Sequence, residues 1–248
     1  MSDIESIKVT VVIPTFNRYL YLLKAIESVL NQTHENLELI IVDDCSSQTE
    51  YLTLLDSKIA EYQQGQSKKQ IRKIRLHQNT KQTFGFACTA HVRNIGILSR
   101  DKQSKYVAFL DDDDQWYSNK VIKQLQALQN QPGVLMSSTD GHATDSKTVS
   151  VYNGEMCKSV VERVFGVSID CTPTIWKLED ILKHNLIITS SVMVSAELLV
   201  KVKGFADIPN PCAEDYDCWK RCLQHTNLVY VNEPLFLYDL NHGAGRNW

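Results

Sequence analysis

Short apolar runs that alternate with amphipathic segments constrain the fold of this chain more than any other feature. Apolar runs predict buried strands at Val9–Ile13, which is β-branched throughout, at Leu37–Val42 and at Tyr106–Leu110, and a further strand is predicted at Ile71–Leu76. Between them, apolar residues recur at helical spacing, which predicts helices within Leu22–Leu30, Leu52–Tyr62 and Ala87–Ser99. The order β-α-β-α-β-α-β predicts an α/β fold of Rossmann-like type, with a mostly parallel central sheet and helices on both faces.

The second half of the chain is less regular. We expect helices at Ser118–Leu128, with Ser118 as the N-cap, at Ser195–Val202 and at Glu214–Leu223. Strands are predicted at Val134–Met136, Ile187–Val194 and Leu228–Val231. The polar stretch Ser137–Thr174 shows little periodicity, and irregular loops of this kind often carry specificity.

Composition argues against several classes of protein. The 248 residues carry a net charge of −3, with 43% hydrophobic and 22% charged residues, which is ordinary for a globular domain. There is no global basic field to bind nucleic acid, and no apolar stretch reaches the ~18–20 residues of a membrane helix. The first residues lack an apolar signal region, and the seven cysteines form no CxxC pair. We therefore expect reduced thiols and a cytoplasmic location.

Four consecutive aspartates, Asp111 to Asp114, directly follow the apolar run Tyr106–Leu110. Ligands of parallel α/β sheets bind beyond the carboxyl ends of the strands, so these carboxylates are expected at a binding edge. A divalent cation would relieve their mutual repulsion, and hard cations such as Mg²⁺ or Mn²⁺ prefer oxygen ligands. The alternative is a solvated acidic turn, but the position behind a buried strand favours a metal site.

Two further acidic pairs each have two interpretations. Asp43 and Asp44 follow the second predicted strand. Asp44 either has a structural role, as the cap of the following helix or in an Asx turn, or accepts a hydrogen bond from the N3–H of a uracil stacked on Phe16. Glu214 and Asp215 lie at the start of a predicted helix. Carboxylates are favoured there by the helix dipole, so this pair either stabilises the helix or belongs to a site.

Together these segments resemble the family 2 glycosyltransferases of the GT-A fold. The resemblance is carried by Val11–Arg18, Ala25–Thr33 and Leu39–Ser46, by Leu110–Trp116, which is similar to the family's DxD region, and by Glu214–Asp217 with Trp219 and Arg221, which is similar to its ED motif. It extends from about residue 8 to about residue 242 and is thinner between 137 and 185. It implies one GT-A domain over residues 1–248, with a nucleotide-sugar-binding half at 1–117 and an acceptor-binding half at 118–248.

The resemblance implies a role for each matched residue. The donor nucleotide would be bound by Pro14, Thr15, Phe16, Asn17, Asp44, Arg93, Asp111 and Asp112. The metal, Mn²⁺ or Mg²⁺, would be held by Asp113 as the main ligand, with Asp111 and His242. Asp215 would be the catalytic base, with Glu214 beside it. The chain departs from the family's pattern at Cys45, where glycine is usual, and at Asp239, where the family's tail usually carries arginine.

The implied activity is inverting, metal-dependent transfer of a hexosyl or N-acetylhexosaminyl group from a UDP-sugar to a hydroxyl of a glycan or lipid-linked acceptor. The expected setting is bacterial surface polysaccharide or lipooligosaccharide synthesis, in the cytoplasm or at the inner face of the membrane. We hypothesise that Ser137–Thr174 selects the acceptor. Two alternatives stay open. One is a sugar-nucleotide-forming nucleotidyltransferase, against which the lack of glycine in Pro14–Tyr19 counts. The other is a non-catalytic carbohydrate- or metal-binding module.

Overall fold

The structure is a computed structural model that describes residues 3–47, 49–64, 68–144, 174–209 and 214–240. The first part of the chain forms η1 (Ile4–Ser6), β1 (Val9–Thr15), α1 (Tyr19–Leu30), β2 (Leu37–Asp43), α2 (Thr49–Gln64), β3 (Gln70–Arg75), α3 (Thr80–Phe84), α4 (Thr89–Ser99) and β4 (Tyr106–Phe109). It continues with β5 (Gln115–Trp116), α5 (Lys120–Gln129), β6 (Met136–Thr144), β7 (Thr174–Trp176), α7 (Leu178–Lys183), η2 (Thr189–Ser191), β8 (Met193–Ser195), α8 (Ala196–Lys201), α9 (Glu214–Leu223) and β9 (Leu228–Asp239).

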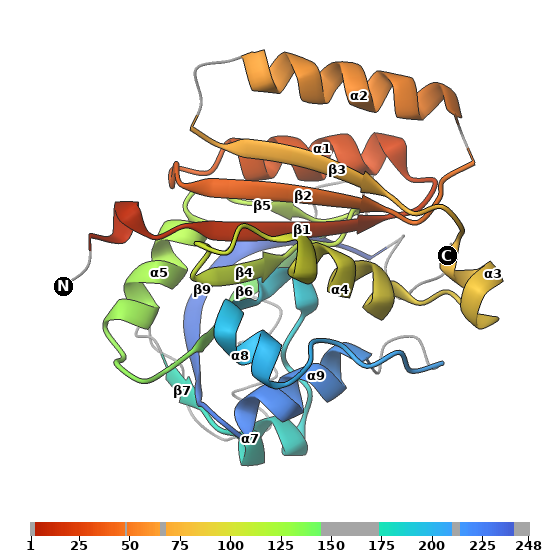
Figure 1. Cartoon of the computed structure of the whole chain (residues 1–248). Helices are drawn as coiled ribbons and strands as arrows, with labels where there is room; N and C mark the ends of the chain where they lie inside the picture. The colour runs from red at the N-terminus through yellow and green to blue at the C-terminus, as the bar shows by residue number, and fades with distance from the viewer. Residues whose placement is uncertain (1–2, 48, 65–67, 145–173, 210–213, 241–248) are drawn as a thin grey trace.

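The strands form one mixed sheet in the order β3-β2-β1-β4-β8-β6-β9-β5, with β7 paired to β9 (Figure 1). The neighbouring strands β3, β2, β1 and β4 all run parallel. Strand β8 joins them to the second half by pairing antiparallel with both β4 and β6. The predicted α/β class is confirmed, and the carboxyl ends of β1, β2 and β4 meet at one edge of the sheet.

Both faces of the sheet are covered by helices, because each buried strand presents apolar side chains alternately to either side. In β1, Val11 and Ile13 pack in one core with α1, α2 and α5, whereas Val12 packs in a second core with α4, α8 and α9. Figure 1 shows α1 and α2 on one side of the sheet and α4 and α8 on the other. Burial of each such side chain contributes about 1.5–3 kcal/mol. The continuous apolar runs in the sequence are therefore explained by burial on both faces.

Helix α4 lies unusually close to β1. A Cβ atom added at Gly96 would lie 2.4 Å from Cγ1 of Val12, which is far inside van der Waals contact. Only glycine therefore allows this approach of helix to strand. The close packing fixes the position of Arg93, which lies one turn earlier on α4.

Three predicted strands differ from those observed. The predicted strand Ile187–Val194 is wrong over its centre, where Thr189–Ser191 forms the 3₁₀ helix η2, and only Met193–Ser195 pairs in the sheet. Of the predicted strand Val134–Met136 only Met136 lies in a strand, β6, which continues to Thr144. Strand β9 begins at Leu228, as predicted, but continues to Asp239. The sequence does not predict these extensions because β6 and β9 pair with each other through polar residues and two register shifts, which erase the apolar alternation.

Helix ends also differ in part from prediction. Helix α5 has Asn119 rather than Ser118 at its N-cap, and no side chain caps it. The short helix α3 was not predicted; the side chain of Asn79 accepts from the amide of Lys81 at its start, and Gly85 closes it with φ of 81°. Ser195 is the N-cap residue of α8, as expected, although its hydroxyl makes no capping hydrogen bond.

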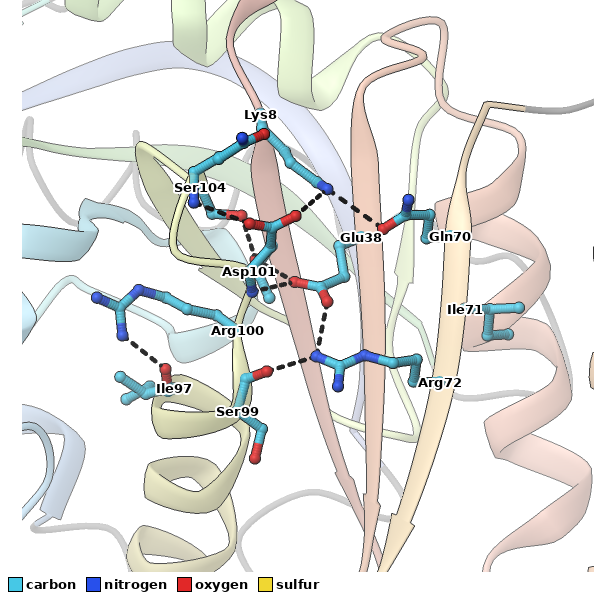
Figure 2. Close-up of polar contacts among 12 residues, drawn as sticks. Lys8, Glu38, Gln70, Ile71, Arg72, Ile97, Ser99, Arg100, Asp101 and Ser104 are labelled. Carbon is cyan, nitrogen blue, oxygen red and sulfur yellow. Dashed lines mark hydrogen bonds and ion pairs between the residues drawn. The ribbon is translucent and has the colours of Figure 1, made fainter.

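A polar network occupies the amino ends of the parallel strands (Figure 2). Glu38 of β2 is buried, and its carboxylate accepts from the hydroxyl of Thr10 at 2.8 Å, the amide of Asp101 at 2.8 Å and the guanidinium of Arg72 at 2.7 Å. Lys8 in turn pairs with Asp101. Each carboxylate in this network has a cationic partner, so it stabilises the fold without an added ion.

Within the described ranges, no helix has the length and apolarity that crossing a bilayer requires. The described cysteines Cys45, Cys88, Cys218 and Cys222 are free thiols.

Candidate active site

The polar residues predicted to form a site follow the carboxyl ends of neighbouring strands. Strand β1 pairs with β2 on one side and β4 on the other, in parallel register. The segment after β1, the pair Asp43-Asp44 after β2 and the aspartate run after β4 therefore reach the same edge of the sheet. A hydrogen bond of 2.9 Å from the amide of Asp44 to the carbonyl of Thr15 links the first two directly.

The central aspartates of the run are held by residues that follow β1. The hydroxyl of Thr15 donates to Asp112 at 2.8 Å. The guanidinium of Arg18 donates to Asp112 at 3.1 Å and to Asp113 at 2.8 Å. Both carboxylates are buried, with 1% and 9% of each residue exposed. Arg18 belongs to a segment that resembles the family, but no role is predicted for it, because its distance from the aspartates is not visible in the sequence.

Burial perturbs the acid–base behaviour of this run. It raises the pKa of Asp112 to about 7 and the pKa of Asp113 to about 6, while the Arg18 guanidinium lowers both. The charge of Asp111 adds to the increase in the pKa of Asp113. Burial also raises the pKa of Asp114 well above its usual range. The protein's own cations therefore do not fully balance this cluster, and an additional positive charge would be favourable there.

Arg93 connects the aspartate run to the second acidic cluster. It is 4% exposed and donates to Asp111 at 2.6 Å and to Glu214 at 3.1 Å. Burial acts to lower the pKa of Arg93, but the charges of Asp111 and Glu214 outweigh it and raise the value above normal. Since Asp111 follows β4 and Glu214 begins α9, one fixed cation brings together residues 103 positions apart in the sequence.

Asp215 lies beside Glu214 at the start of α9. Its carboxylate accepts from the hydroxyl of Thr189 at 2.9 Å and from the amide of Tyr216 at 2.6 Å. Burial raises the pKa of Asp215 to about 6, and the charge of Glu214 adds to the shift, whereas Arg93 and Thr189 lower it. At pH 7 such a carboxyl is roughly nine-tenths ionised and can accept a proton.

The residues predicted to bind a base have more structural partners than the sequence indicates. The carboxylate of Asp44 accepts three hydrogen bonds. Two come from Thr80, from its amide at 2.8 Å and its hydroxyl at 2.7 Å, and one comes from the side-chain amide of Asn79 at 3.0 Å. Burial raises the pKa of Asp44, and the bonds from Thr80 lower it. Asp44 thus holds the start of α3, a later helix than the one it was predicted to cap, and the N-cap residue of α3 itself is Asn79. Its carboxylate oxygens keep lone pairs that could also accept from a ligand.

Backbone conformation explains two features of this region. Asn17 and Cys45 both have left-handed φ angles, 54° and 59°. A left-handed residue at position 45 accounts for the glycine that is usual there in the family, because glycine adopts this conformation without steric cost. The side chain of Asn17 accepts from the amide of Ser47 at 2.9 Å, which joins the segment after β1 to the loop after β2. Phe16 is half-buried beside it, and Pro14 pairs with Val42 within the sheet.

The donor atoms of the aspartate run suit a hard divalent cation. Asp111 and Asp113 offer carboxylate oxygens, and Mg²⁺ is commonly held by one or two carboxylates together with substrate phosphates. No group of three or more histidine, cysteine or acidic side chains that could hold a metal occurs within the described segments. An ion held by Asp111 and Asp113 would therefore need the substrate or water to complete its coordination. The third predicted ligand, His242, lies outside the described residues.

The short helix η2 was not predicted from the sequence. Its hydroxyl-bearing residues contact both acidic clusters, since Thr189 binds Asp215 and Ser190 binds Asp114. The available signal was the run Thr189–Ser191 inside an otherwise apolar stretch. Three consecutive hydroxyl-bearing residues are unusual in a buried strand, because each buried hydroxyl needs a hydrogen-bond partner of its own.

The fold matches solved structures of other proteins. TarS 1–349 of S. aureus, in complex with UDP-GlcNAc, has a TM-score of 0.66 and 17% sequence identity, over 96% of this chain and 60% of that one. The mannosyltransferase PcManGT of Pyrobaculum calidifontis, in complex with GDP-Man and Mn²⁺, has a TM-score of 0.63 and 14% identity, over 97% of this chain and 60% of that one. At these identities the likeness defines the fold alone, and that fold is of the GT-A class.

Sequence similarity then defines the family. A family model described as Glycosyl transferase family 2 matches residues 10–160. The putative teichuronic acid biosynthesis glycosyltransferase TuaG of Bacillus subtilis is 34% identical over 245 residues, which cover 97% of this chain and 82% of TuaG. The chain belongs to glycosyl transferase family 2, as the resemblance predicted. It spans only 24% to 27% of the length of three uncharacterized glycosyltransferases of Rickettsia species that it also matches.

Proposed function

We propose that this protein is an inverting glycosyltransferase that moves a sugar from a UDP-sugar to an acceptor hydroxyl group. The observation that carries the proposal is the double contact of Arg93 with Asp111 and Glu214. It brings the aspartate run and the acidic pair that contains Asp215 to one edge of the sheet. Transfer with inversion needs a donor site and a base on opposite sides of a single reacting carbon, and in this proposal the two clusters take these two roles.

The carboxylate of Asp215 is the proposed base. It takes the proton of the acceptor hydroxyl as that oxygen attacks the anomeric carbon, while the bond from the anomeric carbon to the diphosphate oxygen breaks and UDP leaves. The pKa of Asp215, raised to about 6 by burial, lies near the working pH and still leaves the carboxyl ionised at pH 7. Glu214 assists by fixing Arg93 beside it.

The residues around the proposed donor site fix the positions of the aspartates. Arg18 and Thr15 fix the backbone loop that carries Asp112 and Asp113, and Arg93 fixes Asp111. When bound to Asp111 and Asp113, Mn²⁺ or Mg²⁺ would stabilise the negative charge that develops on the departing diphosphate. In this proposal Pro14, Phe16, Asn17 and Asp44 would contact the uridine, so that residues 1–117 would bind the donor and 118–248 would carry the acceptor side.

TarS and TuaG, two of the similar proteins, support the choice of substrates. TarS is described in complex with UDP-GlcNAc, which supports a UDP-sugar donor, whereas PcManGT is described with GDP-Man and Mn²⁺. The name of TuaG refers to teichuronic acid biosynthesis, which supports a role in surface polysaccharide synthesis with a glycan or lipid-linked acceptor. Membership of family 2 argues against the nucleotidyltransferase alternative.

A release assay over a panel of nucleotide sugars tests the proposal. UDP-glucose, UDP-GlcNAc, UDP-GalNAc, UDP-glucuronic acid and GDP-mannose are each incubated with the protein and Mn²⁺, and free nucleoside diphosphate is measured. We expect UDP release from at least one UDP-sugar, with water or an added glycan as acceptor. EDTA should stop the release, and added Mn²⁺ should restore it.

Each other outcome separates the alternatives. Release of GDP alone would change the donor to a guanine nucleotide. Metal binding without release from any donor would support a non-catalytic module and overturn the proposal. Pyrophosphate release from UTP and a sugar 1-phosphate would support the nucleotidyltransferase. Release that continues unchanged in EDTA would show that the reaction needs no divalent metal.

A further inference from the structure

The helix η2 contains three consecutive hydroxyl residues that are almost completely buried. Thr189, Ser190 and Ser191 are 3%, 0% and 1% exposed, respectively. A buried hydroxyl is costly unless it is hydrogen-bonded, so each of the three needs a partner. Their partners differ in kind: two of the hydroxyls bind carboxyl groups of the proposed active site, whereas that of Ser191 donates to the carbonyl of Ile188 at 2.6 Å, within the same turn.

Ser190 binds both ends of the aspartate run. Its hydroxyl oxygen accepts from the amide of Asp111 at 3.0 Å, and the same hydroxyl donates to the carboxylate of Asp114. The amide of Asp114 also donates to the carbonyl of Asp111 at 3.1 Å, which closes the run into a turn. The hydroxyl of Ser190 therefore joins the two ends of the loop that carries the proposed donor-binding aspartates, in addition to the contacts of Thr15, Arg18 and Arg93.

The preceding residue binds the other acidic cluster. Thr189 donates from its hydroxyl to the carboxylate of Asp215 at 2.9 Å. The adjacent residues Thr189 and Ser190 thus reach two groups that are about one hundred positions apart in the sequence. Neighbouring residues of one turn cannot move independently, because the turn is closed by a hydrogen bond of 3.0 Å from the amide of Val192 to the carbonyl of Thr189.

The turn is also held from the side of the core. The indole of Trp116 donates to the carbonyl of Ser190 at 2.8 Å, and the side chain of Gln124 donates to the carbonyl of Ser191 at 2.9 Å. Lys120, which is fully buried, donates to Gln124 at 2.6 Å and lies 4.2 Å from the ring centroid of Trp116. Helix α5 and strand β5 therefore fix η2 in place before any ligand binds.

We infer that Thr189 and Ser190 are positioning residues that set the catalytic base in a fixed location relative to the donor-binding aspartates. This inference rests on the proposed function. The relative position of the two clusters matters for catalysis only if one binds the donor and the other accepts the proton. The two hydroxyls should then affect different steps. Thr189 should control turnover through Asp215, and Ser190 should control donor binding through the aspartate run.

A purely structural role would give a different result. If the hydroxyls served only to satisfy buried groups, then removal of any of the three would lower stability alone. The charged groups that face Asp215 are Glu214, which raises its pKa, and Arg93, which lowers it. The amide of Tyr216 and the hydroxyl of Thr189 also lower that pKa by donating to the carboxylate. Loss of the Thr189 donor should therefore raise it.

The first experiment compares Thr189→Val with Thr189→Ser. Valine keeps the volume and removes the donor, and serine keeps the donor. With the UDP-sugar that gives the fastest UDP release in the panel, we expect kcat of Thr189→Val at pH 7 to fall about ten- to a hundredfold. The acid limb of its pH profile should move upward by about one pH unit, while UDP binding in Mn²⁺ stays within about twofold of wild type by calorimetry. Thr189→Ser should restore both the rate and the limb.

The second experiment compares Ser190→Ala with Ser191→Ala. Both changes remove one buried hydroxyl from the same turn, but of the two only Ser190 touches the aspartate run. Ser190→Ala should weaken UDP binding in Mn²⁺ about tenfold and leave the acid limb in place. Ser191→Ala is the matched control and should change neither quantity. Thermal unfolding of each variant shows whether it is folded; should the valine variant fail to fold, Thr189→Ala takes its place against Thr189→Ser.

The outcomes distinguish this inference from the function on which it rests. If Asp215→Asn abolishes turnover but Thr189→Val keeps the wild-type rate and pH profile, the positioning role is wrong and the proposed base stands. If Asp215→Asn turns over normally, the proposed function fails first. If Ser190→Ala and Ser191→Ala alter UDP binding equally, the hydroxyls of η2 are structural only.

Discussion

The two ends of the same parallel strands carry acidic residues in opposite electrostatic conditions. At the amino ends, Glu38 is buried yet pairs with Arg72, and Asp101 pairs with Lys8, which lowers the pKa of Asp101 through a hydrogen bond (Figure 2). At the carboxyl ends, burial raises the pKa of Asp112 to about 7 and that of Asp113 to about 6, although Arg18 contacts both.

The difference shows how charge balance separates a structural cluster from the proposed functional one. A matched cluster needs nothing further, because each carboxylate has a donor and the desolvation penalty is offset. An unmatched cluster is destabilising in the free protein and becomes favourable when a cation and a phosphate-bearing ligand bind. Removal of a carboxylate should therefore cost mainly stability at the amino ends and mainly activity at the carboxyl ends.

The largest expected effect is on turnover at the carboxyl ends. Asp215→Asn keeps the size of the side chain but cannot take a proton, so turnover should fall about 10²–10⁴-fold. UDP binding in Mn²⁺, measured by calorimetry, should stay near wild type, because the carboxylate of Asp215 is held by Thr189 and Tyr216 rather than by the aspartate run. A variant with near-normal turnover would remove Asp215 from the role of base.

The next effect concerns the donor. Asp113→Ala should reduce UDP affinity in Mn²⁺ about a hundredfold, to the level that wild type shows in EDTA. Asp101→Asn, at the opposite ends of the strands, is the matched control and should bind UDP normally. Calorimetric titration of UDP with and without Mn²⁺ measures both. Tight binding of UDP by wild type in the absence of any divalent cation would contradict the metal role.

A smaller effect is expected in free energy of unfolding. Glu38→Ala leaves the donors of Thr10, Arg72 and Asp101 without their shared acceptor. Arg72 can still reach water, since its side chain is 47% exposed, so we expect a loss of about 2–3 kcal/mol. Chemical denaturation measures the loss. The kcat of the folded variant should be unchanged. A large fall in kcat without loss of stability would contradict the purely structural role of the cluster at the amino ends.

The smallest effect is expected for Lys8→Met. The pair Lys8–Asp101 is partly exposed, and such pairs contribute about 0.2–1 kcal/mol. The loss should shrink further in about 0.5 M salt, because screening weakens exposed pairs. Denaturation at low and high salt provides the measurement. A salt-independent loss above about 2 kcal/mol would show that the network acts as one buried unit.

The part of the fold built from regular apolar patterns could be predicted from the sequence. Strands β1, β2 and β4 follow from their largely apolar runs, and their parallel order follows from the intervening helices. The second half could not be predicted as well, because β6 and β9 bury polar residues such as Asp140 and pair across register shifts. In the hydrophobic pattern of the sequence, a strand with buried polar residues cannot be distinguished from a surface loop.

The carboxylates of the candidate site could be predicted, as could Thr15 and Arg93, but two other residues that hold these carboxylates could not. Asp111 to Asp114 and Asp215 stand out because acidic residues gather there at the ends of predicted elements, where α/β folds bind their ligands. Arg18 and Thr189 do not stand out, since an arginine after a strand and a threonine in an apolar run are both common. Their importance comes from contacts with residues 95 and 26 positions away, which only the folded chain brings about.

The most direct test of the central claim is a crystal structure of this protein with UDP and Mn²⁺. We expect that the ion contacts Asp111 and Asp113, that the diphosphate lies against the aspartate run, and that Asp215 faces the sugar side of the diphosphate. A nucleotide bound at any other edge of the sheet, or an ion that leaves Asp113 untouched, would contradict the proposed site.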